Sequence, residues 1–299
     1  MITLRTFAEV RAAVSGSVAL VPTMGFLHEG HLSLISAAAD VADTTVVSLF
    51  VNPTQFGDDV DLDAYPRNEE RDAALSQSVG ADILFAPSAE EVYPEGKRVT
   101  VHVGGVGDAM EGRFRHGHFE GVATVVAKLF AGIEPDHAFF GKKDAQQLAV
   151  VRTMRSGLRF AVRIHGMPTV RERDGLALSS RNTRLTPADR QDAISLSRAL
   201  FAAADAIESG MEDASRIRAT ARSVIEDMPG VELEYVEVAD AHSAAPVETI
   251  VGDSFVAIAA RVGGVRLIDN VVVEAETMTV DRGIMLNHQS ILYEEARSV

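Results

Sequence analysis

Short apolar runs alternate with segments of helical spacing through the first half of the chain. Strands are predicted at residues 17–23, 44–51, 81–87, 136–141 and 160–166, and helices at 67–80, 119–133 and 144–157, with a further helix that opens near Gly30. Strands this apolar, separated by helices, are typical of a parallel sheet covered on both faces. The pattern predicts an α/β fold with a Rossmann-like domain, which binds ligands at the carboxyl ends of its strands.

The pattern changes near residue 170. Two helices are predicted near 187–209 and 212–227, followed by strands at 233–240, 254–262 and 265–273. Helices followed by strands indicate a smaller α+β domain. We therefore predict a Rossmann-like domain over 1–169 and an α+β domain over 170–299. The tail from Thr277 onward lacks clear periodicity, and we expect it to be poorly ordered.

Composition narrows the possible partners. The 299 residues carry a formal net charge of −15, which argues against nucleic acid or an anionic membrane as a partner, because both require a basic face. Cysteine is absent, which excludes disulfides and thiolate metal sites. No apolar run approaches the length of a membrane span, and the first residues do not resemble a secretory signal. The absence of a signal segment favours the cytoplasm. The negative net charge does not exclude a small anionic ligand, because a helix N-terminus with local lysine and arginine can form a positive pocket.

The stretch "MGFLHEGH", residues 24–31, lies between a predicted strand and the helix that follows it. His28 and His31 stand at a helix start, where free backbone N–H groups and the helix dipole favour an anion. Glycines there allow a nucleotide to approach closely. A zinc site of the H-E-x-x-H type fails by one residue of spacing. A capping turn with two surface histidines remains the structural alternative.

Three other segments place polar side chains at the ends of predicted elements. "FVNPTQF" puts the amides of Asn52 and Gln55 beyond a strand, where they could fix a polar substrate or form a bare turn. "FFGKKDAQQ" offers Lys143 for phosphate and Asp144 for a magnesium–phosphate complex, or simply a helix cap with solvated lysines. "LALSSRN", residues 176–182, supplies two hydroxyls and a guanidinium suited to oxyanions, or a polar hinge between domains.

In this order, the segments resemble the bacterial pantothenate synthetase family, which belongs to the nucleotidyltransferases with the HxGH signature. HxGH alone is weak evidence, because many adenylyl-transferring enzymes share it. The specific signal is the ordered series "PTMGFLHEGH", "SLFVNPTQF", "DAYPR", "MEGRFRHGHFEGVATVVAKLF", "FFGKKDAQQL", "DGLALSSRN" and "RLIDN", which extends from about residue 20 to 270. The resemblance implies ATP-dependent condensation of pantoate with β-alanine through pantoyl adenylate, with release of pyrophosphate and AMP. It also implies a homodimer.

The resemblance assigns roles to individual residues. His31 matches the family's proton donor, and His28 the histidine placed among the phosphates. Gln55 and Gln147 match the two glutamines that bind pantoate, and Asn52 is added to this substrate-binding set. Expected to act in catalysis are His28, His31, Lys143, Ser179, Ser180 and Arg181. The expected ATP-binding set is Met24, Gly25, Phe26, Leu27, His28, Glu29, Gly30, His31, Gly141, Lys142, Lys143, Asp144, Val170, Leu178, Ser179, Ser180 and Arg181, with Mg²⁺ near Asp144.

The chain departs from the family pattern at a few positions. Lys142 stands where the family usually has an acid, which puts nucleotide affinity in question. Leu178 replaces a common methionine, and this volume-conserving exchange should matter little. Two rival functions remain for comparison: another HxGH adenylyltransferase, which would need a second phosphate site, and a module that senses ATP without turnover. Formation of AMP from ATP with pantoate and β-alanine separates all three.

Overall fold

The computed structural model describes residues 1–56, 62–63, 65–94, 99–226 and 228–293. Its contacts divide the chain into two compact units. The first unit is Met1–Gly141 with Val150–Met167, and the second is Lys142–Ala149 with Pro168–Val299. The short segment Lys142–Ala149 therefore belongs by its contacts to the second unit, although the first unit surrounds it in sequence.

The first unit is built on a parallel sheet. Its described strands are β1 Ile2–Leu4, β2 Val18–Thr23, β3 Thr44–Leu49, β4 Ile83–Phe85, β5 His137–Gly141 and β6 Arg163–Met167. They lie in the order β1-β4-β3-β2-β5-β6, and every pairing recorded between them is parallel. The predicted α/β class is confirmed, and β1, which the sequence analysis did not predict, adds a strand at one edge.

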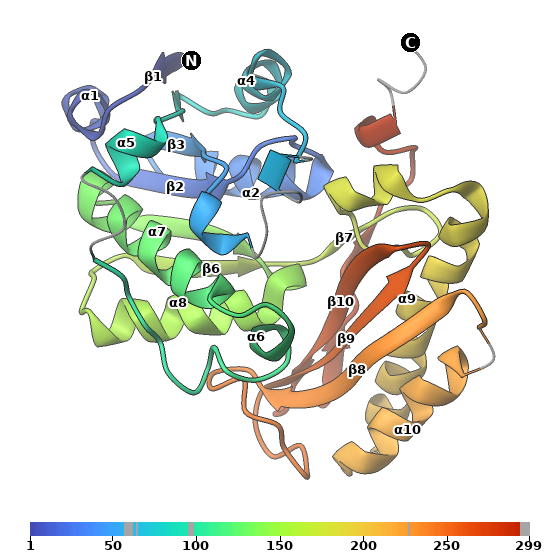
Figure 1. Ribbon diagram of the computed structural model, residues 1–299. Coiled ribbons are helices and arrows are strands. Elements are labelled where there is room, and N and C mark those ends of the chain that lie inside the picture. Colours follow the sequence, from blue (N-terminus) through green and yellow to red (C-terminus); the bar gives the residue numbers. More distant parts are fainter. Residues whose placement is uncertain (57–61, 64, 95–98, 227, 294–299) are drawn as a thin grey trace. The chain divides into compact units, whose positions relative to one another are not determined.

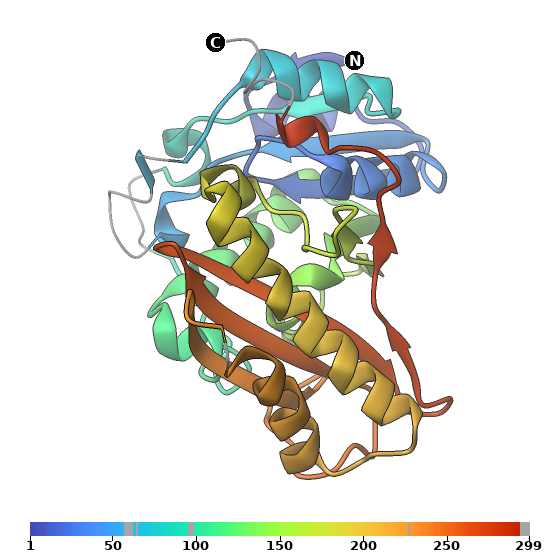
Figure 2. The ribbon, with the colours of Figure 1, turned by 90° about the vertical axis from the view of Figure 1, so that its right-hand side faces the viewer.

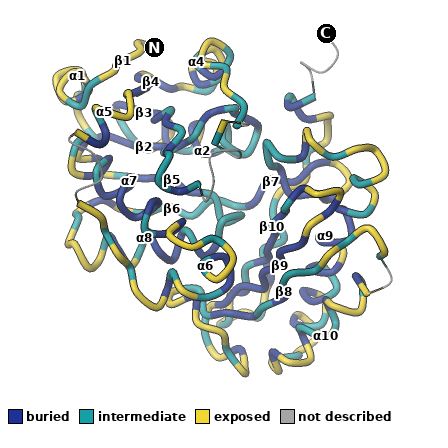
Figure 3. Tube along the Cα trace, viewed as in Figure 1, coloured by how far each residue is buried: buried dark blue, intermediate teal, exposed yellow. Residues whose placement is uncertain are grey.

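The central strands β2 and β3 are buried along almost their whole length (Figure 3), as expected for a parallel sheet that helices cover on both faces. The helical elements of the unit are α1 Phe7–Ala13, α2 Glu29–Ala39, η1 Pro53–Gln55, α4 Glu69–Ser78, α5 Ala89–Val92, α6 Glu111–Phe114, α7 His118–Ile133 and most of α8 Ala145–Gly157. Helix α2 packs on β2, β3 and β5 and touches α4, whereas α1 contacts α7 (Figure 1). The core under α2 includes Leu34, Ile35 and Val47.

The strand order reverses between β2 and β5. From β2 the chain moves outward in one direction through β3 to β4, and from β5 it moves in the other direction to β6. Such a switch point is where open α/β sheets bind ligands, beyond the carboxyl ends of the strands. The stretch that contains both histidines follows β2, and Gly141, the first residue of "GKKD", ends β5.

The second unit contains an antiparallel sheet in the order β11-β10-β9-β8. Its strands are β8 Val231–Asp240, β9 Ser254–Val262, β10 Val265–Glu274 and β11 Thr279–Asp281. Helices α9 Pro187–Glu208 and α10 Ala214–Ile225 pack on this sheet and on each other (Figure 2). Small residues such as Ala203 and Ala221, both fully buried, form part of the shared core and allow this close packing.

The tail differs from the prediction. Residues from Thr277 to Tyr293 are part of the second unit, so the expectation of poor order is wrong for this stretch. Strand β11 pairs with β10, and β12 Ile284–Met285 pairs in parallel with β7 Val170–Arg171. The short helix η4 Ile291–Tyr293 follows. A two-residue edge strand carries too few alternating positions to show a period in the sequence.

Parts of three predictions lie outside the described residues. They are Ala64 in "DAYPR", Asp227 at the end of a predicted helix, and residues 294–299 of the tail. Within the described ranges, no helix combines the length and the apolar character that crossing a membrane requires.

Candidate active site

The loop from Met24 to His28 carries an unusual backbone. Gly25 has φ +89°, and Phe26 follows with φ +52°, a region that side chains other than glycine seldom occupy. A Cβ built on Gly25 would lie 2.8 Å from Cδ1 of Leu49. Glycine is therefore required there for conformation and for space. The strained residue Phe26 needs support from its surroundings.

Asp72 on α4 supplies that support. Its side chain is 1% exposed, and its two carboxylate oxygens accept from the backbone N–H groups of Phe26 at 2.7 Å and Leu27 at 2.8 Å. Arg71 donates to the carbonyl of Leu27 at 2.9 Å, and its guanidinium lies 5.2 Å from the ring centroid of Phe26. A buried carboxylate is stable only when it is paired and hydrogen-bonded, and here the loop N–H groups supply hydrogen bonds and Arg71, 3.6 Å away, supplies an ion pair.

The histidine pair lies at the start of α2. His28 is the N-cap residue, and its backbone N–H donates to Nδ1 of His31 at 3.3 Å. The two rings lie 4.1 Å apart between centroids. Because Nδ1 of His31 accepts, a neutral His31 carries its proton on Nε2, which is then a donor. The N-terminus of α2 adds the positive end of a helix dipole.

Asn52 and Gln55 lie in and before the short helix η1, after β3. Nε2 of Gln55 lies 2.9 Å from Sδ of Met24, so the structure brings the second motif against the first. Asn52 is 1% exposed and donates through Nδ2 to Oε1 of Gln55 and to the carbonyl of Gly121, both at 3.1 Å. Its Oδ1 accepts from Tyr93 at 2.8 Å. These contacts favour a role for Asn52 in orienting Gln55.

The main chain of Gln55 is also held. His118 Nδ1 lies 2.9 Å from its carbonyl oxygen, and Arg115 donates to the same oxygen at 3.3 Å. Burial raises the pKa of Tyr93, which keeps this phenol neutral and able to donate to Asn52. Gln55 is therefore fixed through both its side chain and its backbone before any ligand arrives, which limits the entropy cost of binding.

Lys142 to Asp144 form the short helix η2, which belongs to the second unit. Lys142 makes an ion pair with Asp281 at 2.8 Å, whereas Nζ of Lys143 lies 3.9 Å from Oδ1 of Asp144. The unusual Lys142 is thus matched by an acid within its own unit, and Lys143 is the better placed of the two lysines to meet a ligand. Gln147 lies half-buried in the first turn of α8.

The segment with two serines leaves the strand β7. Leu178 donates through its backbone to the carbonyl of Val170 at 2.9 Å, which closes a hairpin. Ser179 then caps the short helix η3 Ser180–Arg184, and its hydroxyl accepts from the N–H of Arg181 at 3.3 Å. Asn182 is buried and fixes the turn through Glu172 at 2.9 Å.

The predicted residues therefore divide between the units. Met24 to His31, Asn52, Gln55 and Gly141 belong to the first unit, and Lys142 to Asp144, Gln147, Val170 and Leu178 to Arg181 belong to the second. No group of three or more His, Asp or Glu side chains able to hold a metal ion occurs within the described ranges. Asp144 could still contribute one ligand, because Mg²⁺ in nucleotide sites is commonly held by one or two carboxylates together with phosphates.

Sequence reasoning missed the residues that support these segments. Asp72 and Arg71 occur in the first turn of a charged helix, where an acid is expected for the helix dipole alone. Asp269 and Asn270 were noticed in "RLIDN" but received no role. The available signal was the presence of consecutive polar residues within the apolar strand 265–273, a pattern that usually needs a buried partner.

An open parallel sheet with a histidine pair at a helix N-terminus beside the switch point defines an α/β enzyme that handles a phosphate-bearing nucleotide. Comparison with known proteins gives the family. The model of the pantoate-beta-alanine ligase family matches residues 2–272, so the chain belongs to that family. It is a ligase that joins pantoate to β-alanine.

Individual relatives agree with this result. Pantothenate synthetase of Heliobacterium modesticaldum is 48% identical over 271 residues, which are 91% of this chain and 96% of that protein. The crystal structure of pantothenate synthetase from Thermus thermophilus aligns with a TM-score of 0.86 at 45% identity, covering 90% of this chain and 98% of that one. Pantoate-beta-alanine ligase from Francisella tularensis, complexed with beta-gamma ATP and beta-alanine, aligns with a TM-score of 0.72 at 31% identity, covering 90% and 97%.

Proposed function

We propose that the ligation proceeds through pantoyl adenylate. A pantoate carboxylate oxygen attacks the α-phosphorus of ATP, and the bond to the β-phosphate breaks to release pyrophosphate. The β-alanine amine then attacks the acyl carbon, loses a proton, and displaces AMP. The histidine pair at the N-terminus of α2 is the observation that supports this proposal, because N–H donors at a helix start are suited to stabilise negative charge on phosphate oxygens.

In the first unit, His31 is proposed to donate from Nε2 to a phosphate oxygen during adenylation, with His28 placed among the same phosphates. Met24 to Gly30 line the nucleotide, and the Asp72 carboxylate, by accepting from Phe26 and Leu27, keeps this strained loop in one conformation. Gln55 is proposed to bind pantoate. Its fixed position supports this role, because a pre-oriented amide holds a hydroxyl or carboxylate at low entropy cost.

In the second unit, Lys143 is proposed to neutralise phosphate charge and Asp144 to bind Mg²⁺. Gln147 is proposed as the second pantoate ligand. Ser179, Ser180 and Arg181 supply hydroxyl and guanidinium donors for phosphate, while Val170 and Leu178 contact the nucleotide. Mg²⁺ held by Asp144 would supply positive charge that stabilises the negative charge developing on phosphate.

Isotope exchange tests the route. With ATP, pantoate and Mg²⁺ but no β-alanine, labelled pyrophosphate should enter ATP, and pantoate with an oxygen-18 carboxylate should finally pass one labelled oxygen to AMP. Formation of ADP would contradict the adenylate. Exchange that requires β-alanine would indicate a concerted or differently ordered reaction. ATP binding with neither exchange nor AMP would indicate a sensing module.

We also propose that the protein is a cytoplasmic homodimer. The proposal rests on the family resemblance and on the composition, not on any contact in the structure. Sedimentation equilibrium should give twice the mass of 32.0 kDa, and a mass of one chain would contradict the dimer. Cell fractionation tests the location.

A further inference from the structure

The motif "RLIDN" has no role in the function proposed above, yet two of its residues are buried and polar. Asp269 is 4% exposed and Asn270 is 3% exposed, and both lie on β10 between β9 and β11. Burial of two such groups costs free energy unless each finds partners. The partners of Asn270 lie in η2, which the proposed function assigns to phosphate and magnesium, and the partner of Asp269 is Arg171, at the start of the hairpin that leads to Ser179.

Asn270 holds the first of these segments. Its Nδ2 donates to the carbonyl oxygens of Lys142 at 3.0 Å and Lys143 at 2.6 Å, two consecutive acceptors in η2. Because the contact is with the main chain, it fixes the position of the backbone from which the side chains of Lys143 and Asp144 extend. Those side chains remain available to a ligand. A single amide group thereby fixes the backbone that presents the proposed phosphate and magnesium ligands.

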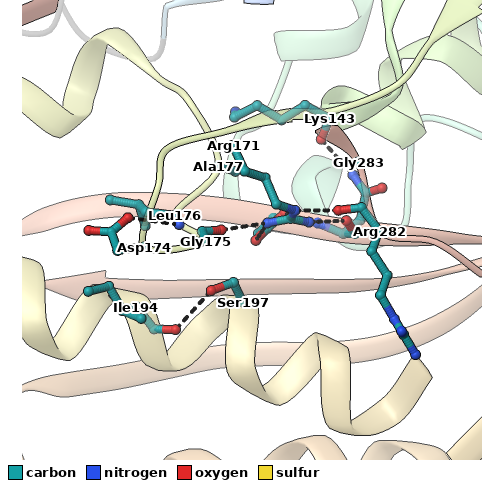
Figure 4. Close-up of polar contacts among 12 residues, drawn as sticks. Lys143, Arg171, Asp174, Gly175, Leu176, Ala177, Ile194, Ser197, Arg282 and Gly283 are labelled. Atoms are coloured by element: carbon teal, nitrogen blue, oxygen red, sulfur yellow. Dashed lines mark hydrogen bonds and ion pairs between the residues drawn. The ribbon is translucent and has the colours of Figure 1, made fainter. Parts of the chain in front are cut away.

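Asp269 holds Arg171, and through it the hairpin that leads to the second segment. The carboxylate accepts from NH1 of Arg171 at 2.6 Å and from NH2 at 3.0 Å, and Arg171 is fully buried. The same guanidinium donates to the carbonyls of Gly175 at 3.1 Å and Asn270 at 3.0 Å, and also to the carbonyl of Arg282 (Figure 4). Arg171 ends β7, from which the hairpin runs to the two serines.

Asp269 and Asn270, which are adjacent on β10, therefore hydrogen-bond to two segments that are far apart in sequence. Side chains of successive strand residues point to opposite faces, which suits contacts with two different partners. Buried ion pairs are weak evidence for stability, because desolvation offsets the attraction between the charges. The Arg171 guanidinium also donates to three backbone carbonyls, and this arrangement is better explained as one that sets the position of the main chain.

We propose that Asp269 and Asn270 are positioning residues that hold the segment Lys142–Asp144 and the segment Ser179–Arg181 in fixed relation for ATP. This inference rests on the proposed function, because that function names phosphate as the ligand of both segments. It predicts that loss of the Asn270 amide impairs the step that uses ATP. The attack of β-alanine on preformed pantoyl adenylate needs no triphosphate and should be spared.

The test uses Asn270→Ala and the isosteric Asn270→Asp, which turns the donor toward two carbonyls into an acceptor. In pyrophosphate exchange the KM for ATP should rise on the order of ten- to a hundredfold, as expected when a ligand-bearing segment moves. Aminolysis of supplied pantoyl adenylate should stay within about threefold of wild type. Asn270→Gln keeps the amide donor and should recover part of the loss that Asn270→Ala shows.

Asp240→Ala is the matched control. Asp240 accepts from Ser243 N at 2.7 Å and His242 N at 3.0 Å in a turn of the same unit, and no contact recorded for it reaches either segment. Its loss should lower the melting temperature by several degrees, about as Asn270→Ala does, with an unchanged KM for ATP. An Asn270 variant with a wild-type KM for ATP, or with both half-reactions reduced equally, would overturn the inference.

Hydrogen exchange in the wild-type protein covers the case in which the variants do not fold. If one strand holds both segments, their protected amides should open with a common free energy, and ATP should slow both together. Separate opening, or ATP protection of one segment alone, would overturn the inference. Wild-type protein that shows neither exchange nor AMP would overturn the proposed function and this inference together, whereas active wild type with unaffected Asn270 variants removes the inference alone.

Discussion

The loop Met24–His28 and the segment Lys142–Asp144 are both held by side chains from distant parts of the sequence, but with opposite chemistry. In the first unit the carboxylate of Asp72 accepts from two successive backbone N–H groups. In the second unit the amide of Asn270 donates to two successive backbone carbonyls. Each support is buried, and each contacts the main chain of a segment that is proposed to bind ATP.

The difference follows from the backbone. Positive φ values at Gly25 and Phe26 turn two N–H groups away from any strand or helix, and an acceptor is needed to satisfy them. In η2 the carbonyls of Lys142 and Lys143 lie toward β10, and a donor is needed. An ionised acceptor makes the stronger bonds, so the strained loop has the charged support. The predictions below probe this contrast, in order of decreasing effect.

Replacing His31, which follows the loop Met24–His28, tests its proposed role in catalysis separately from the role of Asp72 in holding the loop. His31→Ala should lower the rate of adenylation by a hundred- to a thousandfold, on the order found when one donor to developing charge is lost. ATP affinity should change much less, because the helix start remains. Single-turnover adenylation with calorimetric titration of ATP measures both, and His102→Ala, at an exposed histidine, is the control. A rate within a few fold of wild type would show that His31 has another role.

Replacing Asp72 tests the charged support. Asp72→Asn keeps the shape but turns one acceptor into a donor that faces an N–H group, which should cost about 1–3 kcal/mol of unfolding free energy. Displacement of the loop should reduce pyrophosphate exchange up to about a hundredfold. Urea unfolding and exchange rates give the two values. Asp43→Asn is the control, because Asp43 accepts from Ser17 N at 2.8 Å at a surface turn of the same unit. Equal losses in both variants would contradict a special role for Asp72.

Ligand titrations should distinguish the proposed pantoate-binding residue Gln55 in the first unit from the proposed phosphate-binding residue Lys143 in the second unit. Gln55→Ala should weaken pantoate binding about tenfold while ATP binding survives, because an unpaired polar group of the ligand costs about one to two kcal/mol. Lys143→Ala should weaken ATP binding and spare pantoate. Calorimetry of each variant with each ligand checks the pattern. Equal loss of both ligands in both variants would remove the assignment.

The smallest effect concerns a histidine pair that lies in neither support. Nδ1 of His137 on β5 lies 2.9 Å from Nε2 of His165 on β6. Burial, together with the neighbouring His137 and Arg163, lowers the pKa of His165. The unfolded chain therefore binds the proton at a higher pH than the folded chain does, so stability should fall as the pH drops through about 6.5. Urea unfolding at about pH 7.5 and 5.5, on either side of the ordinary histidine pKa, should show a smaller pH effect in His165→Gln. An identical effect would contradict this origin.

Much of the architecture could be predicted from the sequence because it follows from local periodicity. The strands β2, β3 and β5 and the helices α9 and α10 each show a clear hydrophobic period, and they occur close to the predicted ranges. Strand β1 and the pairing of β12 with β7 could not be predicted. Strand β1 has three residues and β12 has two, which is too short to show a hydrophobic period. Such short strands form only because a partner strand is already in place.

The residues of the candidate site could also be proposed from the sequence, whereas the residues that support them could not. His28, His31 and Gln55 stand at strand ends and helix starts, where the local pattern directs attention. Asp72 and Asn270 look in the sequence like an ordinary helix acid and an ordinary strand amide. Only the tertiary structure brings Asp72 to Phe26 and Asn270 to Lys143, because the contacts join residues far apart in the chain. Which backbone groups are left unsatisfied, and which side chain reaches them, is decided only when the chain is packed.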